Sequence, residues 1–326
     1  MIYTGDEMEK LEYTIDVSAA GMRADRLVRK LFPRMPLSHV YKMLRKGRAK
    51  IAGKKVKLDQ RLEKGQVVTL YLMPEDAALL KAKLSTAPEK SPVGKTCKVP
   101  ILYEDEHIIA FEKSAGMAVH AGSGHEAKDT VLGALLAHTG KRGGIFEPGL
   151  VGRLDRDASG IQLGGLSPEG LRGLGELALQ RKIKKVYIAL VSDEKLDDHG
   201  RIDTPLVDEG EGGARMKPGE GGAEAVTVYR VRARAEGVAL VEVMLETGRR
   251  HQIRAHFASI DAPLAGDVRY GDRAWNGLLK KRVGLTRLFL HCTRVEFEHP
   301  VTGRKVRILS PLPPELSAVV GKLGIS

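Results

Sequence analysis

The apolar positions near the N-terminus follow a helical period twice. In "RADRLVRKLF", Leu27, Val28 and Leu31 share one helical face, and Asp25 occupies the place of an N-cap residue. In "PLSHVYKMLRKG" the apolar residues recur at i, i+3, i+4 and i+7; they are Leu37, Val40, Tyr41 and Leu44. Both stretches therefore predict short helices.

Alternating polar and apolar residues follow these helices. "RAKIAGKKV" predicts a β-hairpin around a glycine-containing turn, and "QVVTLYL" predicts a strand. Residues 74–98 mix Pro, Ser, Ala and charged residues with little periodicity, which is typical of a linker. The pattern predicts an N-terminal domain over residues 1–73, a linker over 74–98, and a second domain with a C-terminal tail over 99–326.

The second predicted domain contains many short strands. Two apolar runs flank the turn-like "EDEH", and later strands are "VYIALV", "AVTVYRVRA", "VALVEVML" and "RVEFEH". One helix is expected over residues 168–180, although Gly173 and Gly175 disfavour it. A glycine-rich stretch over residues 207–222 indicates a loop. Because strands and helices do not alternate regularly, we expect an α+β fold with a mixed, largely antiparallel sheet, and not a doubly wound dinucleotide fold.

The composition indicates a soluble globular protein. Hydrophobic residues make up 42% of the 326 residues, which is enough for a sizeable core. The longest apolar runs are shorter than the roughly 18–20 residues of a membrane helix, and the polar, acidic N-terminus is unlike a signal peptide. Cys97 and Cys292 form no Cys-x-x-Cys motif, which argues against a cysteine-based zinc site and suits a reducing compartment. We therefore expect a cytoplasmic protein.

The positive charge is concentrated in one segment. Residues 21–64 contain fifteen Lys and Arg against three acids, an excess equal to the net charge of +12 of the whole chain. Seven of these cations surround the predicted hairpin and are called the basic cluster below: Arg45, Lys46, Arg48, Lys50, Lys54, Lys55 and Lys57. Since Lys and Arg supply most of the non-specific affinity for phosphate backbones, nucleic acid is the expected partner, and a charge that serves only solubility is the alternative.

The stretch "VGRLDRDASG" places two aspartates among arginines within an otherwise apolar region. Asp155 and Asp157 could hold a metal ion, as in many glycosyltransferases, but Arg153 and Arg156 would repel it. An aspartate could instead close an Asx turn before the following Ser-Gly. A third interpretation makes one acid a nucleophile or general base that a nearby arginine keeps ionised. The residues alone leave these three interpretations open.

The stretch "LETGRRHQIRAHF" is a second candidate for a functional site. His251 and His256 are five residues apart, so they do not share a helical face and a zinc pair is not expected. The arginines of this stretch contact phosphate, pair with a carboxylate or form a solvated face; they are Arg249, Arg250 and Arg254. Aromatic residues make up only 5% of the chain, which argues against an extended base-stacking platform. Tyr187 could still hold one flipped base, or be an ordinary strand residue.

Several motifs, in order along the chain, carry a family resemblance. Residues 22–73 resemble the S4 RNA-binding domain through "RADRLVRKLF", "SHVYKMLRKGRAKIAGKKVK" and "LEKGQVVTL". The rest resembles the RluA-type RNA pseudouridine synthases, and most closely the S4-containing large-subunit rRNA enzymes of the RluC kind. The motifs are "ILYEDEHIIAFEKSAGMAVHAGSG", "GRLDRDASG", "RKIKKVYIALV", "TGRRHQIRAH" and "GDVRYGD". The resemblance implies a largely antiparallel catalytic domain with a small N-terminal S4-like RNA-binding domain.

The same resemblance implies a reaction and its residues. Specific uridines of large-subunit (23S) rRNA, free or in an assembling subunit, would be flipped out of their stack and isomerised to pseudouridine. Asp155 would be the essential acid, Arg254 its partner and Tyr187 the ring beside the target base. Arg153 would help to displace the uridine, and Arg249, Arg250 and the basic cluster would contact RNA.

The resemblance calls for no metal or other cofactor, and we expect a monomer. Four positions depart from the family's usual residues: Ser114, Gly152, Ala158 and Arg250. These departures keep open the alternative of a non-catalytic RNA-binding or ribosome-assembly factor on the same fold.

Overall fold

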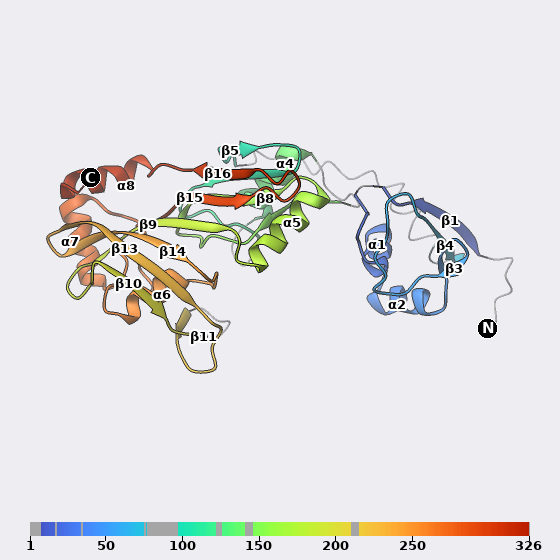
Figure 1. Cartoon of the computed structure of the whole chain (residues 1–326), viewed down its shortest axis with the longest axis horizontal. Coiled ribbons are helices and arrows are strands. Elements are labelled where there is room, and N and C mark those ends of the chain that lie inside the picture. The colour runs from blue at the N-terminus through green and yellow to red at the C-terminus, as the bar shows by residue number, and fades with distance from the viewer. Residues whose placement is uncertain are drawn as a thin grey trace. The chain divides into compact units, whose positions relative to one another are not determined.

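The computed structural model of the chain describes residues 8–16, 18–33, 35–74, 76, 97–121, 126–140, 146–209 and 215–325 (Figure 1). The chain forms two compact units: Met1–Gly94 with Leu136–Pro148, and Lys95–Leu135 with Gly149–Ser326. The predicted linker over residues 74–98 lies largely outside the described residues, so its boundaries stay a prediction.

The first unit contains a four-stranded antiparallel sheet and two helices. The strands lie in the order β1 (Glu9–Thr14), β4 (Val67–Leu72), β2 (Ala49–Ile51) and β3 (Lys54–Lys55). The helices are α1 (Ala24–Leu31) and α2 (Leu37–Arg45). The predicted hairpin is confirmed, because Ala52 and Gly53 connect β2 to β3 with the two positive φ angles that a type I′ turn requires.

Two details of the predicted helices are wrong. Helix α1 begins at Ala24 with Arg23 as its N-cap, so Asp25 lies inside the first turn. There its carboxylate accepts hydrogen bonds from the guanidinium of Arg23 at 3.1 and 3.0 Å. Helix α2 buries Met43, whereas Leu37 is 43% exposed, because the first two residues of this helix face solvent. The core of the unit therefore forms on a slightly different face of α2 from the predicted one.

The second unit is built on one ten-stranded sheet. Its order is β10 (His199–Asp203), β13 (Val226–Ala235), β14 (Val238–Leu245), β9 (Lys184–Ser192), β15 (Leu290–Glu298), β8 (Ser159–Gly165), β6 (Ile108–Lys113) and β5 (Ile101–Glu104). Two further strands, β16 (Lys305–Leu309) and β7 (Gly149–Val151), pair with β15 and β8. Only the β15–β8 pair is parallel among the strand pairs described. The predicted mixed, largely antiparallel sheet is confirmed.

Helices cover both faces of this sheet. They are α4 (Val131–Thr139), α5 (Pro168–Leu179), α6 (Gln252–Ser259), α7 (Arg273–Val283) and α8 (Pro314–Leu323). Leu174 of α5 and Phe257 of α6 pack in one core with Val241 of β14. Leu240, the preceding residue of β14, packs in a second core with Leu279 of α7. Since successive residues of a strand point to opposite faces, α5 and α6 lie on one side of the sheet and α7 on the other.

Helix α5 confirms the predicted helix despite its glycines. A Cβ at Gly173 would lie 2.3 Å from the Cβ of Pro300, so the missing side chain lets the helix approach the segment after β15. A Cβ at Gly175 would meet nothing within 4 Å. The first glycine therefore serves close packing.

The predicted loop over residues 207–222 is wrong in part, because it contains two strands, whereas residues 219–222 do form a turn. Leu206–Glu209 (β11) pairs with Arg215–Pro218 (β12), and residues 210–214 between them lie outside the described part. Leu206 and Met216 are buried against Ala255 of α6, and this apolar contact explains why the strands form. No helix among the described residues is long and apolar enough to span a membrane.

Candidate active site

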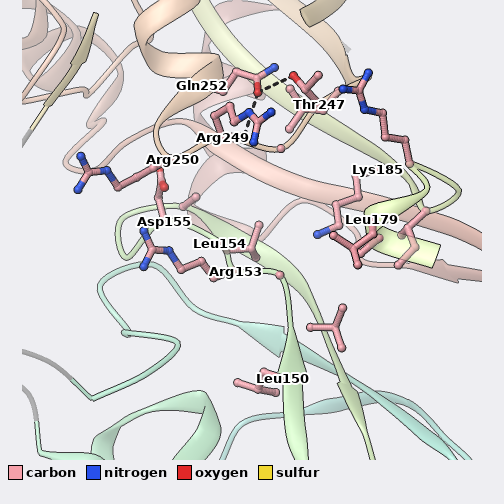
Figure 2. A pocket seen from close by; sticks show the side chains of 18 of the residues that line it. Leu150, Arg153, Leu154, Asp155, Leu179, Lys185, Thr247, Arg249, Arg250 and Gln252 are labelled. Carbon is pink, nitrogen blue, oxygen red and sulfur yellow. Dashed lines mark hydrogen bonds between the residues drawn. The ribbon is translucent and has the colours of Figure 1, made fainter. Parts of the chain in front are cut away.

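A cleft of about 1320 Å³ opens on the side of the large sheet that α5 and α6 cover (Figure 2). Its walls come from the segment after β7, from α5, from β9 and from the residues that lead into α6. Three predicted catalytic residues line it, Arg153, Asp155 and Tyr187, as do the predicted RNA contacts Arg249 and Arg250. Leu150 and Leu179 add apolar surface, so the cleft can receive a ligand that is polar on one side and flat and apolar on another.

Asp155 lies between β7 and β8, and Gln162 of β8 fixes this segment. The amide oxygen of Gln162 accepts from the backbone N–H of Leu154 at 3.1 Å. Its amide nitrogen donates to the carbonyls of Val151 and Gly152 at 3.1 and 3.2 Å. Because Gln162 is only 2% exposed, these bonds meet little competition from water.

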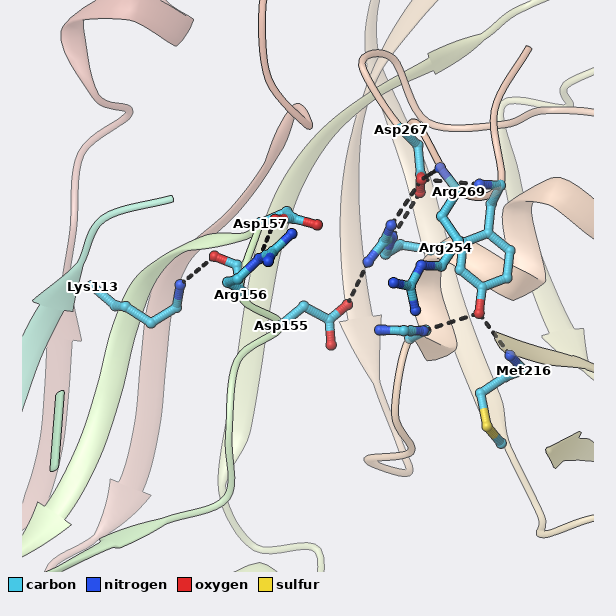
Figure 3. Close-up of polar contacts among 10 residues, drawn as sticks. Lys113, Asp155, Arg156, Asp157, Met216, Arg254, Asp267 and Arg269 are labelled. Carbon is cyan, nitrogen blue, oxygen red and sulfur yellow. Dashed lines mark hydrogen bonds and ion pairs between the residues drawn. The ribbon is translucent and has the colours of Figure 1, made fainter. Parts of the chain in front are cut away.

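Lys113, the last residue of β6, also holds this segment in place. Its ammonium donates to the carbonyls of Ser114, Met117 and Arg156 at 3.0, 2.9 and 2.9 Å, and the side chain is fully buried (Figure 3). Burial lowers the pKa of Lys113 to about 7, although the nearby charge of Asp155 opposes this shift. A buried lysine thus ties the loop after β6 to the segment that carries Asp155.

Arg254, in the first turn of α6, places a buried guanidinium between two carboxylates (Figure 3). Its Nε and Nη2 donate to the two carboxylate oxygens of Asp267 at 2.7 and 2.8 Å. Its Nη1 lies 3.5 Å from Oδ2 of Asp155. Burial lowers the pKa of Arg254, but the hydrogen bonds and charge of Asp267, helped by the charge of Asp155, leave it above its ordinary value. A fixed positive charge therefore faces Asp155.

Asp267 is the anchor of this arginine. It is 1% exposed, and its carboxylate also accepts from the backbone N–H groups of Arg269 and Tyr270 at 2.9 and 3.0 Å. Burial raises the pKa of Asp267, but the hydrogen bonds and charge of Arg254 and the two backbone hydrogen bonds hold it below its ordinary value. The carboxylate is therefore ionised at neutral pH and fixes the orientation of Arg254.

Tyr187 brings an aromatic ring to the cleft from the middle of β9. It pairs with Val243 of β14 and Cys292 of β15 and is 5% exposed. Burial raises the pKa of its hydroxyl well above the ordinary value, and Cys292 and Asp155 act in the same direction. The ring is therefore neutral and offers a flat surface near the carboxylate.

The two histidines of the arginine motif do not come together. His251 precedes α6 with a φ of 50°, and its Nδ1 lies 3.0 Å from the hydroxyl of Tyr270. His256 is buried, with Nδ1 2.9 Å from Oγ1 of Thr227 and Nε2 2.9 Å from the carbonyl of Thr204. Each histidine thus has its own structural partners.

The remaining predicted arginines differ in their surroundings. Arg153 is exposed at the cleft and makes no hydrogen bond or ion pair with the residues that the structure describes. Arg249 donates from Nε to the carbonyl of Glu224 at 2.9 Å, and Arg250 pairs with Asp208. All three line the cleft.

The structure separates the interpretations of the aspartate pair. The Asx turn is wrong, because the Asp155 carboxylate meets Arg254 and the turn is closed by the Ala158 N–H donating to the Asp155 carbonyl at 3.2 Å. Asp157 pairs with the adjacent Arg156 at 3.0 Å and does not line the cleft. Of the two acids, Asp155 alone is presented to the cleft with an arginine behind it.

The basic cluster lies on α2, on the β2–β3 hairpin and just beyond them. Lys46, Lys54 and Lys57 are exposed, and Lys55, also exposed, donates to the carbonyl of Arg45. Two members have acidic or aromatic neighbours: Arg48 lies 3.6 Å from Asp76, and the Lys50 ammonium lies 5.1 Å from the centre of the Tyr71 ring. The cluster is therefore mostly available to an anionic partner.

Three residues that support the cleft carry no prediction from the sequence: Lys113, Gln162 and Asp267. Their partners are backbone groups or side chains on other elements, so no local spacing marks them. The one available signal was that Lys113 and Asp267 stand inside stretches that resemble the family, "FEKSAG" and "GDVRYGD".

Comparison with known proteins identifies the family. Residues 107–259 match the family model described as RNA pseudouridylate synthase. The ribosomal large subunit pseudouridine synthase D of Xanthomonas campestris is 31% identical over 94% of this chain and 90% of that protein. The ribosomal large subunit pseudouridine synthase C of Haemophilus ducreyi is 33% identical over 95% of each chain. The Escherichia coli protein of the same name has the same identity and the same coverage.

The fold agrees with this match. The solved structure of human RNA pseudouridylate synthase domain containing 4 superposes with a TM-score of 0.55 at 24% identity, over 69% of this chain and 93% of that one. Sequence likeness over nearly the whole length and likeness of fold agree, and the chain belongs to the RluA-type RNA pseudouridine synthases.

Proposed function

We propose that this protein isomerises specific uridines of large-subunit ribosomal RNA to pseudouridine. The observation that carries the proposal is the Asp155 carboxylate at the cleft, 3.5 Å from the buried guanidinium of Arg254 and near the ring of Tyr187. The names of the most similar relatives supply the class of RNA.

The target uridine has to leave its stack before it can react. Unstacking costs a few kcal/mol, which contacts in the cleft must offset. Arg153 is exposed there without a partner among the described residues, so it is free to take the place of the extruded base. The cleft then receives uracil on its apolar side.

Asp155 acts on the ribose. Its carboxylate either attacks C1′ or takes the proton from C2′, and both routes need the ionised form. Arg254 holds a positive charge 3.5 Å from this carboxylate. Asp267 keeps the guanidinium in place during the reaction.

Tyr187 supports the base while it turns. After the bond from N1 to C1′ breaks, uracil has to rotate so that C5 faces C1′. A neutral ring fixed in the centre of a sheet offers a flat surface over which this rotation can occur while the base stays in the cleft.

The first unit would hold the RNA. Its sheet, two helices and basic cluster would act as an S4-like domain, with Lys54, Lys55 and Lys57 on phosphates. Arg249 and Arg250, at the cleft, would contact RNA nearer the target. We further propose that the protein acts as a cytoplasmic monomer.

The test is tritium release from large-subunit rRNA labelled at uracil C5, with a chelator present. Asp155→Asn should lower the rate at least about 1000-fold and leave RNA affinity within a few-fold, since the loop bonds do not involve its carboxylate. Asp157→Asn is the matched control and should retain activity, because Asp157 does not line the cleft.

Other outcomes would favour other functions. A fully active Asp155→Asn variant would show that Asp155 is not the essential acid. RNA binding by wild type without release from free rRNA or from assembling subunits would favour a non-catalytic assembly factor. Loss of wild-type activity in the chelator would favour a metal-dependent enzyme.

A further inference from the structure

Lys185 is a cation in the cleft without a role in the reaction proposed above. It lies on β9 two residues before Tyr187, so both side chains leave the same face of the strand. Figure 2 shows the Lys185 side chain pointing into the cleft, which it lines together with Tyr187. Any base that reaches Tyr187 therefore comes close to this ammonium group.

Lys185 has no partner within the described part of the protein. Among these residues, its ammonium makes no hydrogen bond and no ion pair. The other cations of the cleft are different: Arg181 pairs with Glu224, and Arg250 pairs with Asp208. Arg153 also lacks a partner among the described residues, but it is exposed to solvent, whereas Lys185 is partly buried.

This arrangement is unfavourable for stability alone. Burial lowers the pKa of Lys185, and no nearby carboxylate among the described residues compensates for it; the thiol of Cys292 is the neighbour that opposes the shift. A cation that is withdrawn from water without a partner destabilises the folded state. The Lys185 side chain would therefore be stabilised by a bound ligand that accepts its hydrogen bonds.

Gly152 makes room for the ammonium beside the catalytic segment. A Cβ at this position would lie 3.3 Å from Nζ of Lys185, and the φ of 64° also disfavours a side chain. The ammonium consequently rests against the segment that carries Asp155 three residues later.

The chemistry of the reaction creates negative charge close to this place. When the bond from N1 to C1′ breaks, the electron pair leaves with N1 and spreads over O2 and O4 of the uracil. Meanwhile Asp155 either bonds to C1′ or holds the proton from C2′. When C5 bonds to C1′, the same electron pair forms the new bond, and Asp155 either leaves C1′ or returns the proton to C2′. The proton of C5 then leaves to solvent, and N1 takes one up.

We propose that the Lys185 ammonium is catalytic: it donates a hydrogen bond to a carbonyl oxygen of the target uracil and stabilises the anion of the detached base. Lys185 keeps its own proton throughout. This inference rests on the proposed function and adds the group that holds the leaving base, whereas Arg254 acts on the carboxylate. A preorganised donor at a developing anion in a dry site contributes more than the same donor in water.

The experiment compares Lys185→Met with Lys184→Met in the full-length protein. Methionine keeps the unbranched side chain and removes the charge, and Lys184, the adjacent residue of β9, does not line this cleft. Three quantities are measured: the single-turnover rate of tritium release at saturating enzyme, the Kd for the RNA with its salt dependence, and the midpoint of thermal unfolding. Wild type is assayed first on the same RNA.

We expect Lys185→Met to lower the single-turnover rate about 100-fold, with the Kd and its salt dependence unchanged. Its unfolding midpoint should equal or exceed that of wild type, because a partly buried cation without a partner among the described residues is removed. Lys184→Met should resemble wild type in all three measurements.

Three results would overturn the inference. An unchanged rate would show that Lys185 does not act on the base. A weaker Kd with a smaller salt dependence would make Lys185 a phosphate contact, and a lower unfolding midpoint would make it a structural residue. If wild type released no tritium from any large-subunit rRNA, both the proposed function and the role of Lys185 would be refuted. If wild type and Lys185→Met released tritium at the same rate, only the role of Lys185 would be refuted.

Discussion

At the scale of single residues, each charged group around Asp155 has its own structural task. Arg254 faces the carboxylate, Asp267 orients Arg254, and Lys113 holds the backbone of the segment. Asp155 thus meets a buried arginine, whereas Arg153 and Arg156 of the same stretch are exposed, so only part of this dense charge is internal. The groups depend on one another, and removal of one should leave another without a partner.

Asp267→Asn should destabilise the protein by about 3–5 kcal/mol, because it leaves the charge of Arg254 buried with Asp155 as its remaining carboxylate neighbour at 3.5 Å. Chemical denaturation measures this change. The matched control is Asp261→Asn, whose carboxylate is 73% exposed and pairs with Lys195; it should change stability by less than about 1 kcal/mol. Equal effects of the two variants would contradict the role given to Asp267.

Lys113→Met should destabilise the fold by about 3 kcal/mol or more, because three buried carbonyls lose their donor. The pH dependence gives a second readout. With a folded pKa of about 7 against an ordinary 10.5, Lys113 progressively loses its proton above pH 7 when folded but keeps it up to about pH 10.5 when unfolded. Its contribution to the free energy of unfolding therefore rises with pH by up to about 1.4 kcal/mol per unit in this window.

Measurement of unfolding in urea from pH 7 to 10 on wild type and Lys113→Met isolates this lysine from other titrating groups. The difference in stability between the two proteins should grow with pH. Parallel curves would mean that Lys113 keeps its charge in the folded state up to pH 10.

Sequence reasoning reached part of this network. The pairing of Arg254 with Asp155 and the place of Tyr187 were implied by the family resemblance, and the structure brings these groups to one cleft. Asp267 was not predicted, because it reaches Arg254 from a separate segment and its other partners are backbone amides. Lys185 was missed for a different reason: a lone lysine on a strand gives no sign of facing a cleft until the sheet order is known.

At the scale of elements, the hydrophobic period predicted helices and strands better than it predicted their ends. The helix over residues 168–180 and the hairpin after α2 form as expected. The expected loop over 207–222 instead contains β11 and β12, because burial of Leu206 and Met216 against α6 outweighs the local glycine content. Contacts between distant elements decide such cases, and they are not visible in a local pattern.

The two glycines of α5 test whether contacts between distant elements outweigh local helix propensity. Gly173→Ala should destabilise the protein by about 1–3 kcal/mol, because its Cβ would lie 2.3 Å from that of Pro300. Gly175→Ala, two residues on, has open space and should stabilise it by about 0.5–1 kcal/mol through helix propensity alone. Thermal unfolding of the two variants gives the signs. A stabilised Gly173→Ala would mean that α5 can move away from Pro300 easily.

At the scale of the whole molecule, charge and chemistry belong to different units. The basic cluster lies in the first unit, whereas the cleft and all its residues lie in the second. The positive excess of residues 21–64 equals that of the whole chain, so the rest of the protein is balanced. We therefore expect RNA affinity and chemical rate to respond to different substitutions.

Replacement of Lys54, Lys55 and Lys57 together by alanine tests this division. The variant should bind RNA more weakly, and the slope of log Kd against log salt should fall by about 0.7–0.9 for each phosphate that the protein no longer neutralises. Its single-turnover rate at saturating enzyme should match that of wild type, since none of the three residues lines the cleft. Replacement of Lys195, Lys280 and Lys281, which are exposed in the second unit, removes the same charge and is the control.

The two triple variants separate local binding from net charge. If both weaken binding equally, the first unit contributes only general positive charge and its S4-like role is refuted. If the first variant also lowers the saturated rate, binding by the basic cluster is coupled to the step that places uridine in the cleft. A change confined to Kd and its salt dependence, and to the first variant, would establish that the N-terminal unit holds the RNA while the Asp155 cleft performs the chemistry.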